Sequence, residues 1–427
     1  MRPKPPKRRI LPRLSSNRAN RLRKLVVVGT ATAGLAGFAL AAAGPAMADP
    51  TFSYVMVGSD TIQDVMNAYA VSVSDGILAS YNAVNPVTVG THELITPAHN
   101  GTGGNQNNCS FARPNGSTEG FDALDASVNT STTLVPPAPG PQPGCIDISR
   151  SSSGPGSIAS SGPGSLSSTG NLIYIPFAVD AVTGATAPTT AGQTTTIKTP
   201  SGSQTITVPV TNITTADAFT LTDLKTLFAS CANVTEGGVT YNPNTAGAGQ
   251  QQIDLYVPQS GSGTLKFWAS TLGFSATSLP GCLHQTIASG PAATEPVEEH
   301  DGTAYASDPN GYGPFSIAQW ISQSNGHDDR RHTAILHSIN GVAPMSGSAL
   351  NASFPVLREV YNVMQFDHVV NTGDGKFDAT LAGLFAGSTS KLCASPITIK
   401  SYGFGTLPNA NLPDACGATT ASLRVQQ

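Results

Sequence analysis

Short apolar runs alternate with helical patterns along this chain, and few architectures accommodate that order. The β-rich run 52–57 is followed by residues 62–69, whose apolar positions lie three and four residues apart. Residues 253–257 form another β-rich run that leads into a helical pattern from Leu265, and 172–182 has the composition of a buried strand. Helices that follow strands in this way favour layers of helices packed on a sheet. The sequence therefore predicts an α/β fold with a largely parallel sheet.

Three turns made mainly of glycine, serine and threonine stand at the starts of predicted helices. They comprise residues 58–61, 115–120 and 260–264. A helix start carries unpaired backbone N–H groups and the positive end of the helix dipole, and hydroxyl side chains add further donors. Several such starts that meet could bind a tetrahedral oxyanion without many cationic side chains. Each turn taken alone is more simply explained by ordinary helix capping.

The first 48 residues are typical of an export signal. Residues 1–24 carry ten lysines or arginines and no acidic residue, and 25–43 are apolar. The small-residue sequence Ala46-Met47-Ala48 follows, which predicts cleavage after Ala48. As a membrane anchor the apolar stretch is barely long enough, and no later segment is apolar and long enough to cross a bilayer. We therefore expect export, removal of the signal, and no membrane insertion afterwards.

The net charge of the mature protein narrows the classes of molecule that it could bind. The whole chain has 22 basic and 26 acidic side chains, so loss of the ten basic residues before position 25 leaves 12 against 26. The mature protein then carries a net charge near −14. A strongly acidic surface disfavours nucleic acid and anionic membranes as partners. Any anion site must be built locally, against the mean field of the protein.

Six cysteines, all of them after the export signal, fit a protein that is located in an oxidising, extracellular compartment. An even number of cysteines in an exported chain predicts three disulfides, and pairing in sequence order is the simplest connectivity. No cysteine follows the apolar stretch as a lipidation site, so we expect a released, extracellular protein. The six positions are Cys109, Cys145, Cys231, Cys282, Cys393 and Cys416.

Motifs of catalysis and metal binding are weak in this sequence. No G-x-S-x-G nucleophile motif occurs, and no zinc-binding spacing is present, so we expect neither an enzyme nor a metal site nor a cofactor. The run Glu298-Glu299-His300-Asp301 could bind a cation. Because acidic surface loops are common, we interpret this run as an exposed loop.

Seven segments between about residues 50 and 410 follow one another in an order seen in one family. They are VGSDTI at 57–62, GSTEG at 116–120, DISRSS at 147–152, FTLTDLKTLF at 219–228, SGSGT at 260–264, GYG at 311–313 and FPVLREVY at 354–361. Together they resemble the phosphate-binding solute-binding proteins of ABC transporters. The resemblance implies the type II periplasmic-binding-protein fold, in which two α/β lobes enclose a ligand cleft.

The resemblance also implies a set of ligand-binding residues. They are Thr61, Ile62 through its backbone, Ser117, Thr118, Arg150, Ser152, Ser262, Gly263 and Thr264. Two positions depart from the family pattern, because Ser152 stands where an aspartate accepts the phosphate proton and Pro258 stands where an arginine is common. Arg113 and Arg150, each beside a matching loop, are candidates to replace that arginine, although surface charge is the commoner role of arginine.

The lobe boundaries follow from the same resemblance. Lobe one would combine residues 49–180 with 336–427, and lobe two would comprise 181–335. The implied function is capture of inorganic phosphate or a similar oxyanion by a monomer that delivers it to an ABC permease. The alternative is a secreted, non-catalytic binding or surface protein that keeps the fold but has lost the phosphate site.

Overall fold

The computed structural model describes residues 54–427 except 75, 86–87, 89 and 98–108. All of these residues belong to one of the two units into which the chain divides, Met47–Gln427. The expected export signal at 1–48 lies outside the described residues. Within them, no helix has both the length and the apolar composition needed to cross a membrane.

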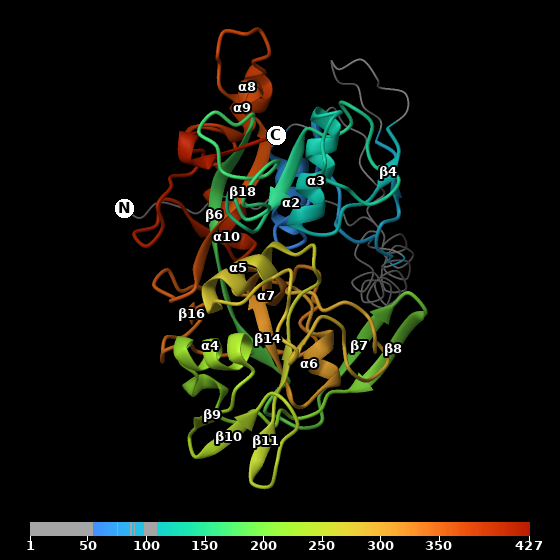
Figure 1. Ribbon diagram of the computed structural model, residues 1–427, viewed down its shortest axis with the longest axis vertical. Helices are drawn as coiled ribbons and strands as arrows, with labels where there is room; N and C mark the ends of the chain where they lie inside the picture. The colour runs from blue at the N-terminus through green and yellow to red at the C-terminus, as the bar shows by residue number, and fades with distance from the viewer. Residues whose placement is uncertain (1–53, 75, 86–87, 89, 98–108) are drawn as a thin grey trace, which may run out of the picture. The chain divides into compact units, whose positions relative to one another are not determined.

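A mixed sheet organises the described chain (Figure 1). Its main strands run in the order β13, β12, β14, β6, β18, β5, β1 and β2, and three short strands, β15, β19 and β20, also pair with β6. The bounds are β1 Tyr54–Gly58, β2 Leu78–Ser80, β5 Ile148–Ser151, β6 Leu172–Thr186, β12 Asp254–Tyr256, β13 Leu283–His284, β14 Gly311–Ser316, β15 Ile335–Leu336, β18 Leu357–Gln365, β19 Gly405–Thr406 and β20 Arg424–Val425. The α/β class is therefore confirmed.

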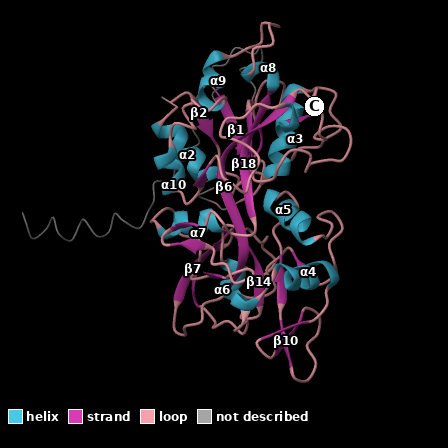
Figure 2. Ribbon diagram, turned by 90° about the vertical axis from the view of Figure 1, so that its left-hand side faces the viewer, coloured by secondary structure: helices cyan, strands magenta, loops and turns pink. Residues whose placement is uncertain are grey.

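The expectation of a largely parallel sheet is wrong at the centre. Strands β1, β2 and β5 pair in parallel, and so do β12, β13 and β14. Strand β6 is antiparallel to both β14 and β18, and β18 is antiparallel to β5. The long strands β6 and β18 lie between the two parallel groups and join them into one sheet (Figure 2).

Two regions of core lie along β6. Its residues up to Ala178 pack in a cluster with Val55, Phe121 and Val363, and we call the elements around this cluster the first half. From Val179 onward β6 packs in a cluster with Trp268, and the elements around it and an adjoining smaller cluster form the second half. The limits of the two lobes given above stay predictions.

Helices lie over both halves of the sheet, as Figure 2 shows. Helix α4 begins at a capping box, in which Thr220 and Asp223 bond to each other's backbone N–H groups. The helix bounds are α2 Gln63–Ser72, α3 Ser117–Val128, α4 Leu221–Ser230, α5 Gly263–Leu272, α6 Thr303–Ser307, α7 Ile317–Ser324, α8 Phe366–Val369, α9 Ala379–Phe385 and α10 Pro396–Ser401, with 3-10 turns at Ala216–Ala218 and Ala421–Leu423.

Small two- and three-stranded sheets lie outside the main sheet. The alternation of threonine with apolar residues in 183–211 predicts an exposed hairpin, and β7 with β8 forms one. The bounds of these strands are β3 Leu94–Ile95, β4 Phe111–Ala112, β7 Thr194–Thr199, β8 Gly202–Thr207, β9 Val234–Glu236, β10 Val239–Asn242, β11 Gln250–Gln252, β16 Met345–Ser346 and β17 Ala349–Leu350.

Three disulfides join the cysteines in sequence order. Cys109 pairs with Cys145, Cys231 with Cys282, and Cys393 with Cys416. The Cys231–Cys282 bond ties the end of α4 to the loop after α5, and it closes the longest of the three loops, with a sequence separation of 51. Cross-links of this kind stabilise a fold mainly by restricting the unfolded chain.

Candidate functional site

The three glycine- and hydroxyl-rich turns meet at the junction of the two halves. Thr61, just before α2, lies with its Oγ1 atom 3.4 Å from Oγ1 of Thr264 at the start of α5. Ser117 at the start of α3 accepts a hydrogen bond of 3.0 Å from the backbone N–H of Ser152, and their hydroxyls lie 3.2 Å apart. Both α2 and α3 belong to the first half, whereas α5 belongs to the second.

Glycine is required where α3 and α5 approach each other. A Cβ atom on Gly263 would lie 2.3 Å from Oγ of Ser117 and 2.6 Å from Oγ of Ser152. Gly116 has a φ of +95°, and a Cβ there would lie 2.4 Å from the carbonyl oxygen of Gly261. That carbonyl also accepts a hydrogen bond of 3.0 Å from the N–H of Thr118. Any side chain at these two glycines would push the helix starts apart.

The hydroxyl of Ser262 both caps helix α5 and contacts the candidate site. Its Oγ accepts hydrogen bonds from the backbone N–H groups of Thr264 and Leu265, at 3.0 and 3.2 Å, as an N-cap does. The same hydroxyl donates to Oε2 of Glu299 at 3.0 Å. The capping explanation of this turn is therefore correct, and it leaves the hydroxyl hydrogen free to reach an acceptor at the junction.

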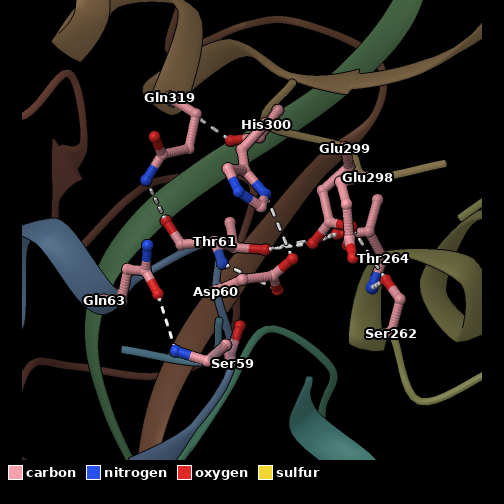
Figure 3. A network of polar contacts seen from close by, with 12 residues as sticks. Ser59, Asp60, Thr61, Gln63, Ser262, Thr264, Glu298, Glu299, His300 and Gln319 are labelled. Carbon is pink, nitrogen blue, oxygen red and sulfur yellow. Dashed lines mark hydrogen bonds and ion pairs between the residues drawn. The ribbon is translucent and has the colours of Figure 1, made fainter. Parts of the chain in front are cut away.

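A carboxylate of the protein itself occupies the place where these hydroxyls converge. Oε1 of Glu299 accepts hydrogen bonds from Oγ1 of Thr61 at 2.5 Å and from Oγ1 of Thr264 at 2.8 Å, and Oε2 accepts the one from Ser262 (Figure 3). Glu299 has no exposed surface. We call the hydroxyls of Thr61, Ser262 and Thr264 the cradle. The cradle therefore places hydroxyl donors from both halves around one carboxylate.

The electrostatic setting of Glu299 is unfavourable for its charge. Burial, and then the negative charge of Asp60, raise the pKa of Glu299, although His300, Thr61 and Arg358 act in the opposite direction. Hydrogen bonds from hydroxyls can stabilise a buried carboxylate but do not cancel its charge. The cradle therefore tolerates an anion without being strongly cationic.

Arg358 on β18 is the guanidinium that reaches the cradle. One of its amino groups donates to Oγ1 of Thr264 at 2.8 Å and to the carbonyl of Ser152 at 3.0 Å. Its Nε and other amino group donate to Oδ2 of Asp180 at 3.0 and 2.7 Å. The sequence motif 354–361 contains Arg358 but gives it no ligand role. The sequence did contain a signal for a buried cation here, namely Asp180, because an aspartate inside an otherwise apolar strand requires a buried partner.

The structure places Arg150 away from the cradle. Its side chain is fully buried behind the first turn, where it donates to the carbonyls of Gly58, Ser59 and Tyr81 and to the hydroxyl of Ser80. These four bonds use four of the five N–H groups of the guanidinium. Arg150 therefore holds the turn in place from within the first half.

The remaining predicted ligand residues lie around the same junction. Oγ1 of Thr118 is buried and has no hydrogen-bond partner among the described residues. Ile62 precedes α2, and its side chain is fully buried in the first core. The carbonyl of Thr61 accepts a hydrogen bond of 2.6 Å from Gln319 of α7, which adds another contact between the halves.

The run 298–301 is not the exposed loop that its composition suggests. Glu299 has no exposed surface and His300 only 5%, because the run packs between the halves. His300 forms an ion pair with Asp60, with 3.1 Å between Nδ1 and Oδ2. Burial opposes charge on both groups, but their contact outweighs it, lowering the pKa of Asp60 and raising that of His300. Asp60, Glu298 and His300 are the described residues grouped closely enough to hold a metal ion.

A pair of opposite charges lies on the helices that meet at the junction, Asp122 in α3 and Lys266 in α5. Burial raises the pKa of Asp122 to about 7 against the attraction of Lys266, and the charges of Asp125 and Glu119 add to the rise. An unfolded aspartate titrates near pH ~3.9. The folded state therefore binds the proton more tightly between these values, and this group's contribution to stability falls as pH rises through that window.

Asp122→Asn is accordingly expected to stabilise the fold at pH 8 but not at pH 3.5. We expect a gain on the order of 1 kcal/mol at pH 8, well below what the full change in pKa implies, because the side chain is partly exposed and screened. Urea unfolding of both proteins at the two pH values measures the difference. An equal difference at both pH values would contradict this account.

Comparisons with known proteins find similarity only among solved structures. No family model matches the chain, and no curated protein sequence matches it. An ABC-type phosphate transport receptor from Vibrio cholerae is 14% identical, covering 83% of this chain and 100% of its own, with a TM-score of 0.41. A phosphate binding protein from Stenotrophomonas maltophilia is 13% identical, covering 84% and 92%, with a TM-score of 0.38.

Proposed function

We propose that this chain is an extracellular solute-binding protein that captures an oxyanion, with inorganic phosphate as the preferred ligand. The observation that carries the proposal is the convergence of three hydroxyls from both halves on one carboxylate. The two oxygens of Glu299 stand in for two oxygens of a tetrahedral oxyanion. A site that holds a buried carboxylate with hydroxyl donors has the chemistry to hold a phosphate oxygen pair.

Phosphate would enter when Glu299 withdraws with the run 298–301. Thr61, Ser262 and Thr264 would then donate to the ligand instead, and the hydroxyls of Ser117 and Thr118 would supply further donors from the start of α3. Arg358 would contribute charge at the edge of the site through the amino group that now contacts Thr264. No bond of the ligand is broken in this scheme, and an ABC permease is the partner we propose for release.

One observation favours a second candidate function. Glu299 fills the cradle, and Asp180 neutralises the guanidinium nearest to it. A secreted binding protein that has lost the anion site but kept the fold would have this arrangement. In that case the cradle would serve only to fasten the two halves together.

Calorimetric titration of the purified protein with phosphate, beside sulfate, tests the proposal. We expect saturable binding of one phosphate, and an approximately tenfold lower affinity in Ser117→Ala, because a hydrogen bond to a charged ligand contributes about 1.5 kcal/mol or more. Ser72→Ala, which removes an exposed hydroxyl at the far end of α2, is the matched control and should bind as the natural protein does. Absence of phosphate binding would favour the second candidate.

A further inference from the structure

Three side chains beside the cradle bring metal-ligand atoms together. Asp60 precedes α2 in the first half, while Glu298 and His300 flank Glu299 in the second (Figure 3). One ligand atom from each lies within 4.8 Å of the other two. Bonds of about 2.0–2.2 Å place the ligand atoms of a tetrahedral Zn²⁺ roughly 3.3–3.6 Å apart. The 3.1 Å between Asp60 and His300 is close to that separation.

The three candidate ligand atoms are buried and poorly satisfied. Oδ2 of Asp60, Oε2 of Glu298 and Nδ1 of His300 are each buried. Among the described residues their contacts are with one another, through the ion pair of Asp60 with His300 and a contact of Asp60 with Glu298 that, against the effect of burial, lowers the pKa of Asp60. Asp60 is 1% exposed and His300 5%. A buried polar atom without a partner is destabilising, and one cation between these atoms would satisfy all of them at once.

The second oxygen of each carboxylate is already held in place. Oδ1 of Asp60 accepts a hydrogen bond of 2.9 Å from the N–H of Thr61. Oε1 of Glu298 accepts one of 3.2 Å from the side-chain amide of Asn115. Contacts of this kind orient metal ligands and leave the other oxygen directed at the ion.

Arg330, which lines the space beside these residues, is engaged with other carboxylates. Arg330 pairs with Asp64 at 2.9 Å and with Asp328 at 3.1 Å. In the part of the chain that the structure describes, no lysine or arginine forms an ion pair with Glu298 or Glu299. Glu298 is therefore not paired with a lysine or arginine among the described residues.

A cavity adjoins the three ligand residues. A cavity of about 200 Å³ is lined by Asp60, Glu298 and His300 and also by Glu295 and Lys198. It provides a path by which an ion could enter, and room for water as a further ligand. The cradle residues Thr61, Ser262 and Thr264 do not line this cavity.

We propose that Asp60, Glu298 and His300 form a binding site for one divalent transition-metal ion, with Zn²⁺ as the best fit. Two carboxylates and one imidazole are ligands that Zn²⁺ accepts, and water from the cavity completes the coordination. Because the ligands come from both halves, the ion cross-links the halves beside the cradle. Because Glu298 and His300 belong to the run 298–301, a bound ion would oppose the withdrawal of that run that phosphate entry requires, so the site is tested in the absence of phosphate.

Titration of the metal-stripped protein with Zn²⁺, with Mg²⁺ in parallel, tests the site. We expect one Zn²⁺ per chain, a rise in Tm on Zn²⁺ addition, and much weaker binding of Mg²⁺. Glu298→Gln and His300→Gln should each lower Zn²⁺ affinity at least ~tenfold. Glu295→Gln lines the same cavity outside the group and should leave Zn²⁺ affinity unchanged.

X-ray absorption of the Zn²⁺-loaded natural protein makes the test independent of how the variants fold. We expect a first shell of oxygen with one imidazole nitrogen. Unchanged affinity in both folded variants, a first shell without imidazole, or no saturable Zn²⁺ binding by the natural protein would each overturn the proposal.

Discussion

Arg358→Met is expected to lower the free energy of unfolding by about 3–5 kcal/mol, because it leaves the charge of a buried carboxylate without its partner. Asp180 has no exposed surface and receives two hydrogen bonds from Arg358. Its other donors, the hydroxyl of Ser316 and the N–H of Ala318, are neutral. Urea unfolding followed by circular dichroism at pH 7 measures the change.

Two further variants separate the charge effect from loss of packing. The double variant Arg358→Met with Asp180→Asn should recover much of the lost stability, since no unpaired charge remains. Lys376→Met removes an exposed ion pair with Asp367 and should unfold at the same urea concentration as the natural protein. A double variant no more stable than Arg358→Met would show that packing of the arginine, and not its charge, is what matters.

The sequence predicted the parts of the site that depend on local signals. Glycine and hydroxyl residues before a helical pattern mark a helix start, so the turns at Thr61, Ser117 and Ser262 could be located without knowledge of the fold. Their convergence came from the family resemblance. The structure brings them together through close approaches that only glycine permits, as at Gly263.

Other features could not be read from the sequence, because they depend on contacts between distant residues. Glu299 meets Thr61 across 238 positions, and nothing in the run 298–301 distinguishes a buried carboxylate from an exposed one. Arg150 belongs to a predicted ligand loop. In the structure it lies in strand β5 and donates a hydrogen bond to the hydroxyl of Ser80 in β2. The antiparallel pairing of β6 is likewise a property of the fold, since residue composition does not fix the direction of a buried strand.

Glu299→Gln is expected to strengthen phosphate binding by about a hundredfold. In the natural protein the ligand must displace a carboxylate from the cradle, and the two negative charges repel each other at short range. At a separation of 4 Å that repulsion is about 4 kcal/mol for an effective dielectric constant near 20, and a hundredfold change corresponds to ~2.7 kcal/mol. Glutamine keeps the shape of the side chain and removes the charge. Calorimetry in a chelating buffer excludes any contribution from metal.

The direction of this change distinguishes three roles for one carboxylate. Tighter phosphate binding by Glu299→Gln, with Glu295→Gln unchanged, means that Glu299 competes with the ligand. Weaker binding would contradict displacement, because it would mean that the carboxylate contacts a protonated oxyanion while the ligand is bound. If neither protein binds phosphate and Glu299→Gln also lowers the free energy of unfolding, the hydroxyls of Thr61, Ser262 and Thr264 serve Glu299 alone. The cradle would then be a structural fastening between the two halves.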